Sequence, residues 1–392
     1  MVSSTNMTLL PSIEHSIQIP YQLRVLFTEN AFAPDNSLLL DLLDPQGVGF
    51  RSKVAFYLDE GVAQASPGLV EQIESYCQKH KDALDLRGIS LLPAGEAIKN
   101  TSSYLRKIYE EIEDWKICRH SYVIAIGGGA LLDAVGFAAA TAHRGIRHIR
   151  FPTTTLGQGD AGVGVKNGVN YLGKKNFVGT FAPPFAVVND FAFLKTLPEK
   201  HLRNGFIEAI KVALVRDAAF FDWIEINADS LIRSEAQAVQ ELVHRSAQLH
   251  VQHIATSGDP FELGSARPLD FGHWAAHKLE QLSDFRLSHG EAVAIGIALD
   301  TLYSLKKGFL DHPSASRILF LIRRLGFATY AKEIEQKSAN DENAVIAGLE
   351  EFREHLGGML TITLLTGIGS RIEVHEMDTD IILESIGELP RG

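Results

Sequence analysis

Residues 122–145 read YVIAIGGGALLDAVGFAAATAHRG, and this stretch decides the fold of the chain. An apolar run with the composition of a buried strand is followed at once by three glycines and then by an alanine-rich helical pattern. Glycines at such a turn let the backbone approach a pyrophosphate, and the helix start supplies N–H groups and the positive end of a dipole. The same glycines could form a tight turn without any ligand, and their spacing is not GxGxxG. The stretch therefore predicts a strand-turn-helix unit, with Gly127, Gly128 and Gly129 as a candidate phosphate-binding turn.

Similar apolar runs lie on both sides of this stretch, at 16–27, 53–60, 88–96, 146–155 and 185–190, and they alternate with helical patterns. Runs that are apolar on both faces suit a mostly parallel sheet covered by helices. After about residue 196 the chain changes to long amphipathic segments with helical periodicity, and one strand-like stretch returns at 359–369. The sequence thus predicts an α/β domain at 1–195 and a mainly helical domain at 196–392, with a cleft between them.

Composition excludes several classes of protein. The chain has 392 residues, of which 45% are hydrophobic and 22% charged, so it can bury a full core. No apolar stretch approaches the roughly 20 residues of a membrane span, and the N-terminus does not read as a signal peptide, so we expect a cytoplasmic protein. The net charge of -11 argues against nucleic acid as a partner. Cys77 and Cys118 cannot form a disulfide framework, and we expect both to be buried thiols.

Several acidic and imidazole side chains have the spacing of a metal site. Glu208 and Lys211 are three residues apart in a helical segment and share one face. His273 and His277 form an i,i+4 pair, and His289 opens a later helix. One carboxylate and two imidazoles fit a catalytic zinc site with an open position. The chain has 15 histidines, however, so these could also be unrelated core or surface residues.

The segment PTTTLGQGDAGVGVKNGVNYLGKKNFVGTFAPP at 152–184 reads as a long loop between two strands. Loops of this length inside a domain are usually functional or disordered, and the interleaved apolar residues favour order. Lys166, Lys174, Lys175 and Asn176 would make the segment locally cationic, as an anionic ligand requires. An ordinary solvated loop with surface lysines is the alternative.

Taken in order, these segments resemble the 3-dehydroquinate synthases and the wider family of sugar phosphate cyclases, from about Val54 to Gly369. The family pattern of GGG, a helix with Asp, AATxxRG and PTT is matched by Gly127–Gly129, Asp133, Arg144 and the Pro152 segment. TLPEKHLRNGFIEAIK at 196–211 is similar to the family stretch TLPxxxxxxGxxExIK. The resemblance implies a Rossmann-like sheet domain followed by a mainly helical metal-binding domain.

The resemblance also implies roles for single residues. It assigns the metal, Zn2+ or else Co2+, to Glu208, His273 and His289. Catalytic or substrate-handling roles fall to Asp160, Lys166, Asn176, Lys211 and His277. NAD would be held by Asp59, Glu96, Lys99, Gly127, Gly128, Gly129, Asp133, Thr153, Thr154, Lys175 and Thr196. Substrate or phosphate contacts fall to Arg144, His250, Arg267 and Asp270, with Arg144 reaching across the interface of a homodimer.

In this family NAD transiently oxidises a ring hydroxyl, phosphate leaves, the hydride returns, and an aldol step closes a carbocycle. The substrate end of the pattern differs here. 3-Dehydroquinate synthases have Lys at the position of His250 and Asn at that of Asp270, so a substrate carboxylate would meet repulsion. Arg267, shifted from its family position, could compensate for this. FREHLGG at 352–358 stands where basic residues are usual, with Arg353 and His355 as substitutes.

These departures favour a heptulose phosphate without a carboxylate, similar to sedoheptulose 7-phosphate, over the substrate of 3-dehydroquinate synthase. The latter activity remains an alternative. A second alternative is an NAD- and metal-dependent polyol dehydrogenase, against which the lysines at 166, 175 and 211 argue, since a neutral polyol needs no phosphate-binding cations. A third is a non-catalytic NAD-binding scaffold, which the retained candidate ligands disfavour.

Overall fold

The first half of the chain folds around a six-stranded parallel sheet. The computed structural model describes residues 12–43, 51–172, 174–338, 340–355 and 357–389. The strands run in the order β1-β8-β5-β4-β2-β3, and every neighbouring pair is parallel. Their bounds are β1 Val25–Thr28, β2 Ser52–Asp59, β3 Leu84–Leu92, β4 Tyr122–Gly127, β5 Arg147–Pro152 and β8 Ala186–Asp190. The predicted Rossmann-like parallel sheet is confirmed.

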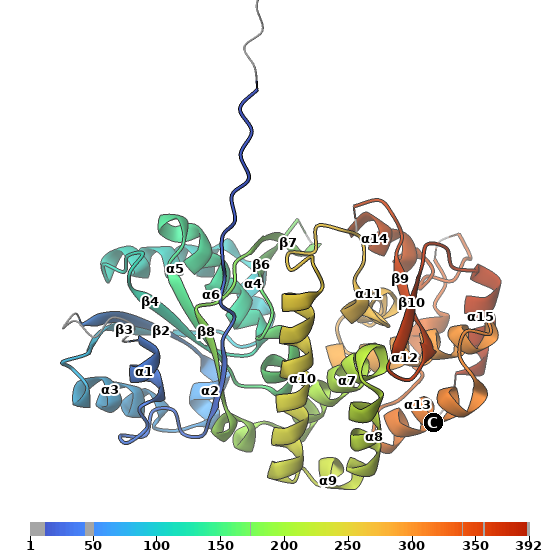
Figure 1. Cartoon of the computed structure of the whole chain (residues 1–392), viewed down its shortest axis with the longest axis horizontal. Helices are drawn as coiled ribbons and strands as arrows, with labels where there is room; N and C mark the ends of the chain where they lie inside the picture. The colour runs from blue at the N-terminus through green and yellow to red at the C-terminus, as the bar shows by residue number, and fades with distance from the viewer. Residues whose placement is uncertain (1–11, 44–50, 173, 339, 356, 390–392) are drawn as a thin grey trace, which may run out of the picture.

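Successive side chains of the strands enter two different cores. Phe56 and Ile124 pack with residues of α1 (Leu38–Leu43) and α3 (Leu69–Lys79). Tyr57 and Ala125, one position further on, pack with α5 (Ser102–Asp114) and α6 (Gly129–Thr141). Figure 1 shows α3 and α5 on opposite sides of the sheet. Burial of both faces explains why these strands are almost continuously apolar in sequence. Two short helices complete this half, α2 (Glu60–Ala65) and α4 (Ala97–Asn100).

The strand order reverses between β2 and β4. The chain passes from β2 to β3 on one side of β2, and β4 then pairs on its other side. The carboxyl ends of β2 and β4 at this reversal are Asp59 and Gly127. Open α/β sheets bind ligands at the carboxyl ends of strands beside such a reversal. The topology therefore favours a ligand site between Asp59 and the glycine turn.

The described residues of the segment at 152–184 do not form the long loop that the sequence suggested. The segment contains a π-helical turn, η2 (Gly157–Ala161), and an antiparallel hairpin of β6 (Lys166–Tyr171) and β7 (Lys174–Phe181). Gly168 pairs directly with Gly179 in this hairpin. A Cβ at Gly179 would lie 2.7 Å from the Asn167 carbonyl oxygen, so the two strands approach too closely for a side chain there. Glycine is rare in strands, which is why the pattern did not indicate a hairpin.

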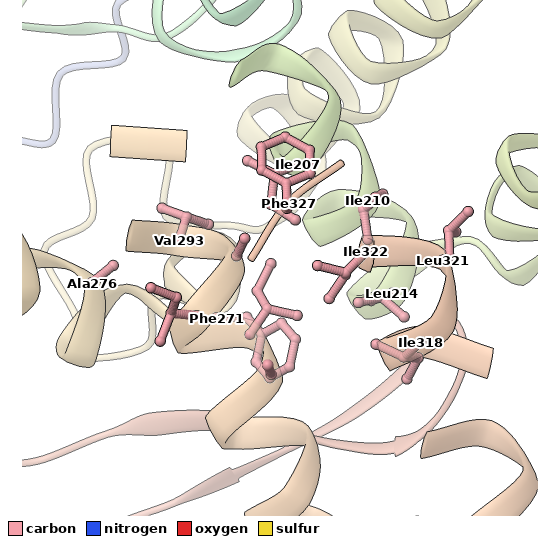
Figure 2. Close-up of a cluster of buried hydrophobic side chains, with 14 of the residues drawn as sticks. Ile207, Ile210, Leu214, Phe271, Ala276, Val293, Ile318, Leu321, Ile322 and Phe327 are labelled. Atoms are coloured by element: carbon pink, nitrogen blue, oxygen red, sulfur yellow. The ribbon is translucent and has the colours of Figure 1, made fainter. Parts of the chain in front are cut away.

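The second half is mainly helical around one large core, as predicted. Figure 2 shows Ile210 and Leu214 of α7 facing Leu321 and Ile322 of α13 in this core. The helices are α7 Glu199–Arg216, α8 Ala218–Ile226, α9 Ala228–Ile232, α10 Ala236–Thr256, α11 His273–Leu282, α12 His289–Lys306, α13 His312–Arg324, α14 Ala347–His355 and α15 Thr379–Glu388. Shorter 3-10 turns are η3 Phe191–Thr196, η4 Pro268–Asp270 and η5 Lys332–Glu335. The strand-like stretch at 359–369 supplies β9 (Ile362–Gly367), which pairs with β10 (Ser370–Val374) as a hairpin.

Two further expectations are wrong. The strand expected at 16–27 is reduced to β1, because residues 12–24 pair with no strand among the described residues and Ile17 and Ile19 are exposed. Cys77 is buried as expected, but Cys118 is exposed in the turn after α5, where it lies 3.4 Å from the Ser121 hydroxyl. Within the described ranges, no helix is both long and apolar enough to cross a membrane.

Candidate active site

Three helices of the second half bring one glutamate and two histidines together. Glu208 lies in the middle of α7, His273 begins α11, and His289 begins α12. One ligand atom from each residue lies within 4.8 Å of those of the other two. Glu208 and His273 are buried, and His289 is partly buried. The structure thus gathers the residues that the sequence suggested as metal ligands.

The two histidines meet because α11 and α12 pack unusually closely. Gly272 precedes α11 with φ +78°, and a Cβ there would lie 2.7 Å from the Ile297 nitrogen of α12. A Cβ at Gly296 of α12 would lie only 2.0 Å from the Gly272 carbonyl oxygen. Both positions therefore require glycine. The resulting contact sets the ring centroids of His273 and His289 5.4 Å apart.

The Glu208 carboxylate is surrounded by cationic and imidazole nitrogens. Lys211 Nζ lies 2.5 Å from Oε2, while His289 Nε2 and His273 Nε2 lie 3.3 and 3.8 Å from Oε1. Burial alone would raise the pKa of Glu208, but Lys211, His289 and His273 together outweigh it and hold that pKa below its usual range. Among the described residues, neither carboxylate oxygen accepts a hydrogen bond of good geometry. A buried carboxylate in this state, facing two imidazole nitrogens, fits a divalent cation held between the three side chains.

A second carboxylate contacts His289 through its other ring nitrogen. Glu280 lies on α11 with its Oε2 3.4 Å from His289 Nδ1, and its Oε1 accepts a hydrogen bond from Lys175 at 3.2 Å. Burial would lower the pKa of His289, but Glu208 and Glu280 raise it to about 10. A carboxylate on one imidazole nitrogen fixes the ring so that the other nitrogen faces a metal. Glu280 is therefore a positioning residue for His289.

We expect Glu280→Gln to weaken divalent-metal binding by about 10- to 100-fold, because the amide cannot orient the imidazole as a carboxylate does. Competition against a chromophoric chelator measures this affinity. Gln281→Ala is the matched control, since it changes the next residue of α11 at an exposed position. Equal affinities in Glu280→Gln and the unchanged protein would remove Glu280 from this role.

Lys211 links Glu208 to the predicted catalytic residue Asp160. Its Nζ lies 3.8 Å from Asp160 Oδ1, and the same oxygen lies 3.0 Å from Nδ1 of His250 on α10. Burial would lower the pKa of Lys211, but Asp160 and Glu208 raise it above its usual range. Burial would raise the pKa of Asp160, which Lys211 and His250 instead lower to about 2. Lys211 is therefore a fixed ammonium group between two carboxylates.

Asp270 and His277 face the same cluster. The His277 ring centroid lies 5.4 Å from that of His273 and 6.3 Å from that of His289. The His277 side chain is exposed, and partial desolvation of its ring, followed by the charges of the two neighbouring imidazoles, lowers its pKa. Burial would raise the pKa of Asp270, but Lys166, followed by His273, lowers it. Both predicted substrate residues thus lie among the proposed ligands.

Glu262, which the sequence did not single out, joins Lys166 to Arg267. Its Oε2 lies 2.6 Å from Lys166 Nζ and 3.0 Å from Arg267 Nε. Other N–H groups of Arg267 donate to the carbonyl oxygens of Glu262, Gly264 and Ala266. The guanidinium is thus engaged within its own loop. The expected compensation by Arg267 for a missing substrate-binding cation finds no support in this arrangement.

The glycine turn leaves open space at the carboxyl end of β4. A Cβ at Gly128 would meet nothing nearer than Thr154 Cγ2 at 3.7 Å, and one at Gly129 nothing nearer than Ala161 Cβ at 3.6 Å. Packing within the chain therefore does not require glycine at either position. The N-terminus of α6 begins here, so its N–H groups face this space. The turn fits a phosphate-bearing ligand better than a purely structural role.

The neighbouring candidates on this edge of the sheet make structural contacts. Thr153 donates its N–H to the Gly127 carbonyl oxygen at 3.0 Å, and Thr154 Oγ1 accepts from the Gly157 nitrogen at 2.9 Å. Asp59 caps α2 by accepting from the Gly61 nitrogen at 2.8 Å, and burial raises its pKa. Thr154 borders the open space at Gly128, and Asp59 lies beside Gly127.

A lysine-centred group lies beside this edge. Lys99 is almost fully buried, and its Nζ lies 2.9 Å from Asp133 Oδ2 and 4.0 Å from Glu96 Oε1. It also donates a hydrogen bond to Asn176 Oδ1. Lys175 and Asn176 are adjacent in β7, yet Lys175 reaches Glu280 and Asn176 reaches Lys99. Asn176 has φ +52°, so the backbone departs from a regular strand between these two contacts. Asn176, expected among the catalytic residues, therefore contacts the residues expected to hold the cofactor.

Some predicted residues lie apart from these groups. Arg144 is exposed in the 3-10 turn η1 (Ala142–Arg144), at the end of α6 opposite Gly129 and roughly 20 Å along the helix axis. Thr196 is exposed, and its hydroxyl donates to the Phe193 carbonyl oxygen at 3.2 Å. Arg353 pairs with Glu350 on α14. The side chain of His355 lies outside the described residues.

The sequence analysis singled out neither Glu280 nor Glu262, and only Glu280 gives a signal in the sequence. Glu280 follows His273 by seven residues and His277 by three, so helical periodicity places all three on one face. Glu262 gives no such signal, because its partner Lys166 lies 96 positions earlier in the chain. Only the folded structure brings them together.

Comparison with known proteins agrees with this geometry. Residues 89–204 match the model of the 3-dehydroquinate synthase N-terminal domain, and residues 205–344 match that of its C-terminal domain. The 3-dehydroquinate synthase of Cereibacter sphaeroides is 34% identical over 334 residues, which cover 85% of this chain and 87% of the relative. The 2-epi-5-epi-valiolone synthase of Streptomyces glaucescens is 33% identical over 364 residues, with 91% and 88% covered.

A solved structure shows the same architecture throughout. The 2-epi-5-epi-valiolone synthase of Streptomyces hygroscopicus subsp. jinggangensis 5008, solved with NAD+ and Zn2+ bound, superposes with a TM-score of 0.83 at 29% identity. The superposition covers 96% of this chain and 99% of that one. Fold and site thus define an enzyme of the sugar phosphate cyclase class. Within this class, the chain belongs to the 3-dehydroquinate synthase family.

Proposed function

We propose that this protein is an NAD- and metal-dependent sugar phosphate cyclase that acts on a heptulose phosphate similar to sedoheptulose 7-phosphate. The reaction would combine transient oxidation, phosphate elimination, re-reduction and intramolecular aldol closure to a carbocycle. The observation that carries the choice of substrate is the pairing of charges around Glu208. Each predicted cation there has a carboxylate within ion-pair distance.

The metal would be held by Glu208, His273 and His289, whose donor atoms and buried carboxylate fit a divalent cation. NAD would lie over Gly128 and Gly129 at the strand-order reversal, with Asp59 beside it. When bound, NAD+ would take up and return a hydride while the metal acts as a Lewis acid on a substrate hydroxyl. A relative of the same architecture was solved with NAD+ and Zn2+ bound, which supports the choice of these two cofactors.

The chain's own residues would hold the substrate in the space around this cluster. The Lys211 ammonium, fixed by Glu208 and Asp160, offers N–H donors and positive charge to a substrate oxygen. His277 offers an imidazole nitrogen close to the His273 ring for proton transfer. Arg144 of a second copy would add a cation in a homodimer, since the Arg144 of the same chain lies at the far end of α6.

A substrate carboxylate would find little positive charge here. Five carboxylates face four cations in this region: Asp160, Glu208, Glu262, Asp270 and Glu280 against Lys166, Lys175, Lys211 and Arg267. A bound metal and the substrate phosphate contribute the same charge whichever of the two candidate substrates is bound. The additional carboxylate of a seven-carbon acid would face Asp270 without a free partner. The relatives named valiolone synthases favour the same choice.

The test compares two substrates with the purified protein, NAD+ and Zn2+ or Co2+. Phosphate release is measured with sedoheptulose 7-phosphate and, separately, with the seven-carbon acid that 3-dehydroquinate synthases use. We expect release from sedoheptulose 7-phosphate. Release from the acid alone would establish the alternative, 3-dehydroquinate synthase, which the relatives bearing that name keep open.

The glycine turn provides a prediction about NAD. Gly128→Ala adds a methyl group where the nearest atom of the chain is 3.7 Å away and φ is -76°, so we expect stability to change by less than about 0.5 kcal/mol. The methyl group would occupy the space left for the pyrophosphate. NAD+ affinity, measured by titration calorimetry, should fall at least roughly tenfold. Unchanged affinity in a normally folded Gly128→Ala protein would place NAD elsewhere.

A further inference from the structure

The main-chain turn before α11 orients His273 as a ligand. His273 Nδ1 lies 3.2 Å from the Phe271 carbonyl oxygen. Because a carbonyl oxygen only accepts, Nδ1 carries the ring proton, which leaves Nε2 unprotonated and facing Glu208 Oε1 at 3.8 Å. The direction of the Phe271 carbonyl group therefore decides which nitrogen of His273 is available to a metal.

Asp300 of α12 contacts the other end of the same peptide group. The bond between Phe271 and Gly272 is trans, so its C=O and N–H groups point in opposite directions. The Gly272 N–H donates to Asp300 Oδ2 at 3.1 Å. A chain of hydrogen bonds thus runs from the Asp300 carboxylate through one peptide group to the His273 ring. The charge at its end polarises the peptide group and makes the Phe271 oxygen a better acceptor.

Packing alone does not explain a carboxylate at this position. Asp300 is completely buried, and its other oxygen accepts from the indole N–H of Trp274 at 2.9 Å. Both donors are neutral, and in the described part of the chain no lysine or arginine forms an ion pair with Asp300. Burial raises the pKa of Asp300 to about 7, which the two hydrogen bonds only partly oppose. A buried carboxylate without a cation destabilises a fold, so its presence here favours a role in the site.

We propose that Asp300 is a positioning residue for the metal ligand His273, on which it acts through the peptide group of Gly272. The inference rests on the metal site of the proposed function and extends it. His289 has its carboxylate partner, Glu280, next to its own Nδ1 atom at 3.4 Å. Asp300 gives His273 a corresponding partner one peptide group further away, so a carboxylate orients each of the two imidazoles.

The experiment measures the affinity of Asp300→Asn for Zn2+ by competition against a chromophoric chelator at pH 8, above the pKa of the carboxylate. We expect this affinity to fall roughly five- to tenfold, less than in Glu280→Gln because Asp300 acts through one more group. Thr301→Val is the matched control. It loses a buried hydrogen bond to the Ile297 carbonyl oxygen on the same helix but leaves the chain of hydrogen bonds to His273 intact, so its affinity should not change.

A second pair of variants keeps the test decisive if Asp300→Asn does not fold. In Asp300→Asn the new NH2 group would face the indole N–H of Trp274, two donors without an acceptor. Trp274→Phe removes this indole N–H, so Trp274→Phe/Asp300→Asn keeps an oxygen for the Gly272 N–H and lacks only the charge. We expect the double variant to bind Zn2+ roughly five- to tenfold more weakly than Trp274→Phe. The visible absorption spectrum of its Co2+ form, which reports the geometry of the ligands, should also differ from that of Trp274→Phe.

Equal affinities and equal Co2+ spectra in Trp274→Phe and the double variant would overturn the inference. A loss of affinity in Thr301→Val as large as that in Asp300→Asn would also overturn it, because a general weakening of α12 would then explain both. Absence of Zn2+ binding by the unchanged protein would instead overturn the metal site of the proposed function.

Discussion

Glu208→Gln should lose metal binding and reduce turnover at least about a thousandfold, equivalent to about 4 kcal/mol of transition-state stabilisation. Glu208 is the one carboxylate among the three gathered donors, and both histidine Nε2 atoms face its Oε1. The amide has nearly the same volume but no charge to offer a divalent cation. Metal content after dialysis and the rate of phosphate release measure the two effects.

The matched control is Glu199→Gln, at the first residue of the same helix, where the side chain is exposed and pairs with Arg203. It should leave both metal content and rate unchanged. Full metal occupancy in Glu208→Gln would remove Glu208 from the metal site.

Arg150→Met should cost about 3 to 5 kcal/mol of the free energy of unfolding. Arg150 is completely buried in β5 and donates to the carbonyl oxygens of Gly162, Gly164 and Lys166 and to Asn167 Oδ1. Burial lowers its pKa to about 10, but the group still carries a proton at neutral pH. Methionine would fill much of the volume and leave these acceptors without a donor. Urea unfolding measures the loss.

Arg147→Met on the same strand is the control. Arg147 donates to the Tyr122 hydroxyl at 2.8 Å and lies 5.1 Å from the centre of that ring, in a partly exposed position. Its loss should cost no more than about 1 kcal/mol. If both variants lose the same free energy of unfolding, the buried hydrogen bonds of Arg150 do not stabilise the segment before Lys166.

The sequence predicts those parts of the fold whose pattern is local. The run before Gly127 is apolar on both faces because its strand lies between two helical layers, so its place in a parallel sheet could be inferred directly. The helical face shared by Glu208 and Lys211 could be inferred from their spacing, and the structure places their charged atoms 2.5 Å apart. The β6–β7 hairpin could not be predicted from the sequence, because the paired positions Gly168 and Gly179 are glycines and not the β-branched or aromatic residues that indicate a strand.

In the candidate site, too, local sequence patterns could be predicted and contacts between distant segments could not. The co-occurrence of Glu208, His273 and His289 in family order could be read from the chain, although only packing at Gly272 and Gly296 brings the histidines together. The carboxylates that pair with the lysines could not be predicted from the sequence, since Glu262 and Lys166 come together only in the folded protein. The role of Arg150 could not be predicted for a related reason. A buried arginine that donates hydrogen bonds to main-chain oxygens needs no acidic partner, so the sequence shows no pattern of opposite charges.

We propose that this protein uses NAD without consuming it while it eliminates phosphate from a sugar. The direct measurement follows phosphate and NADH together while the holoenzyme acts on sedoheptulose 7-phosphate with only catalytic amounts of NAD+. We predict many molecules of phosphate released per molecule of NAD+ present, with no net rise in NADH. NADH that accumulates in proportion to substrate, above all with a neutral polyol, would contradict the account and identify a dehydrogenase.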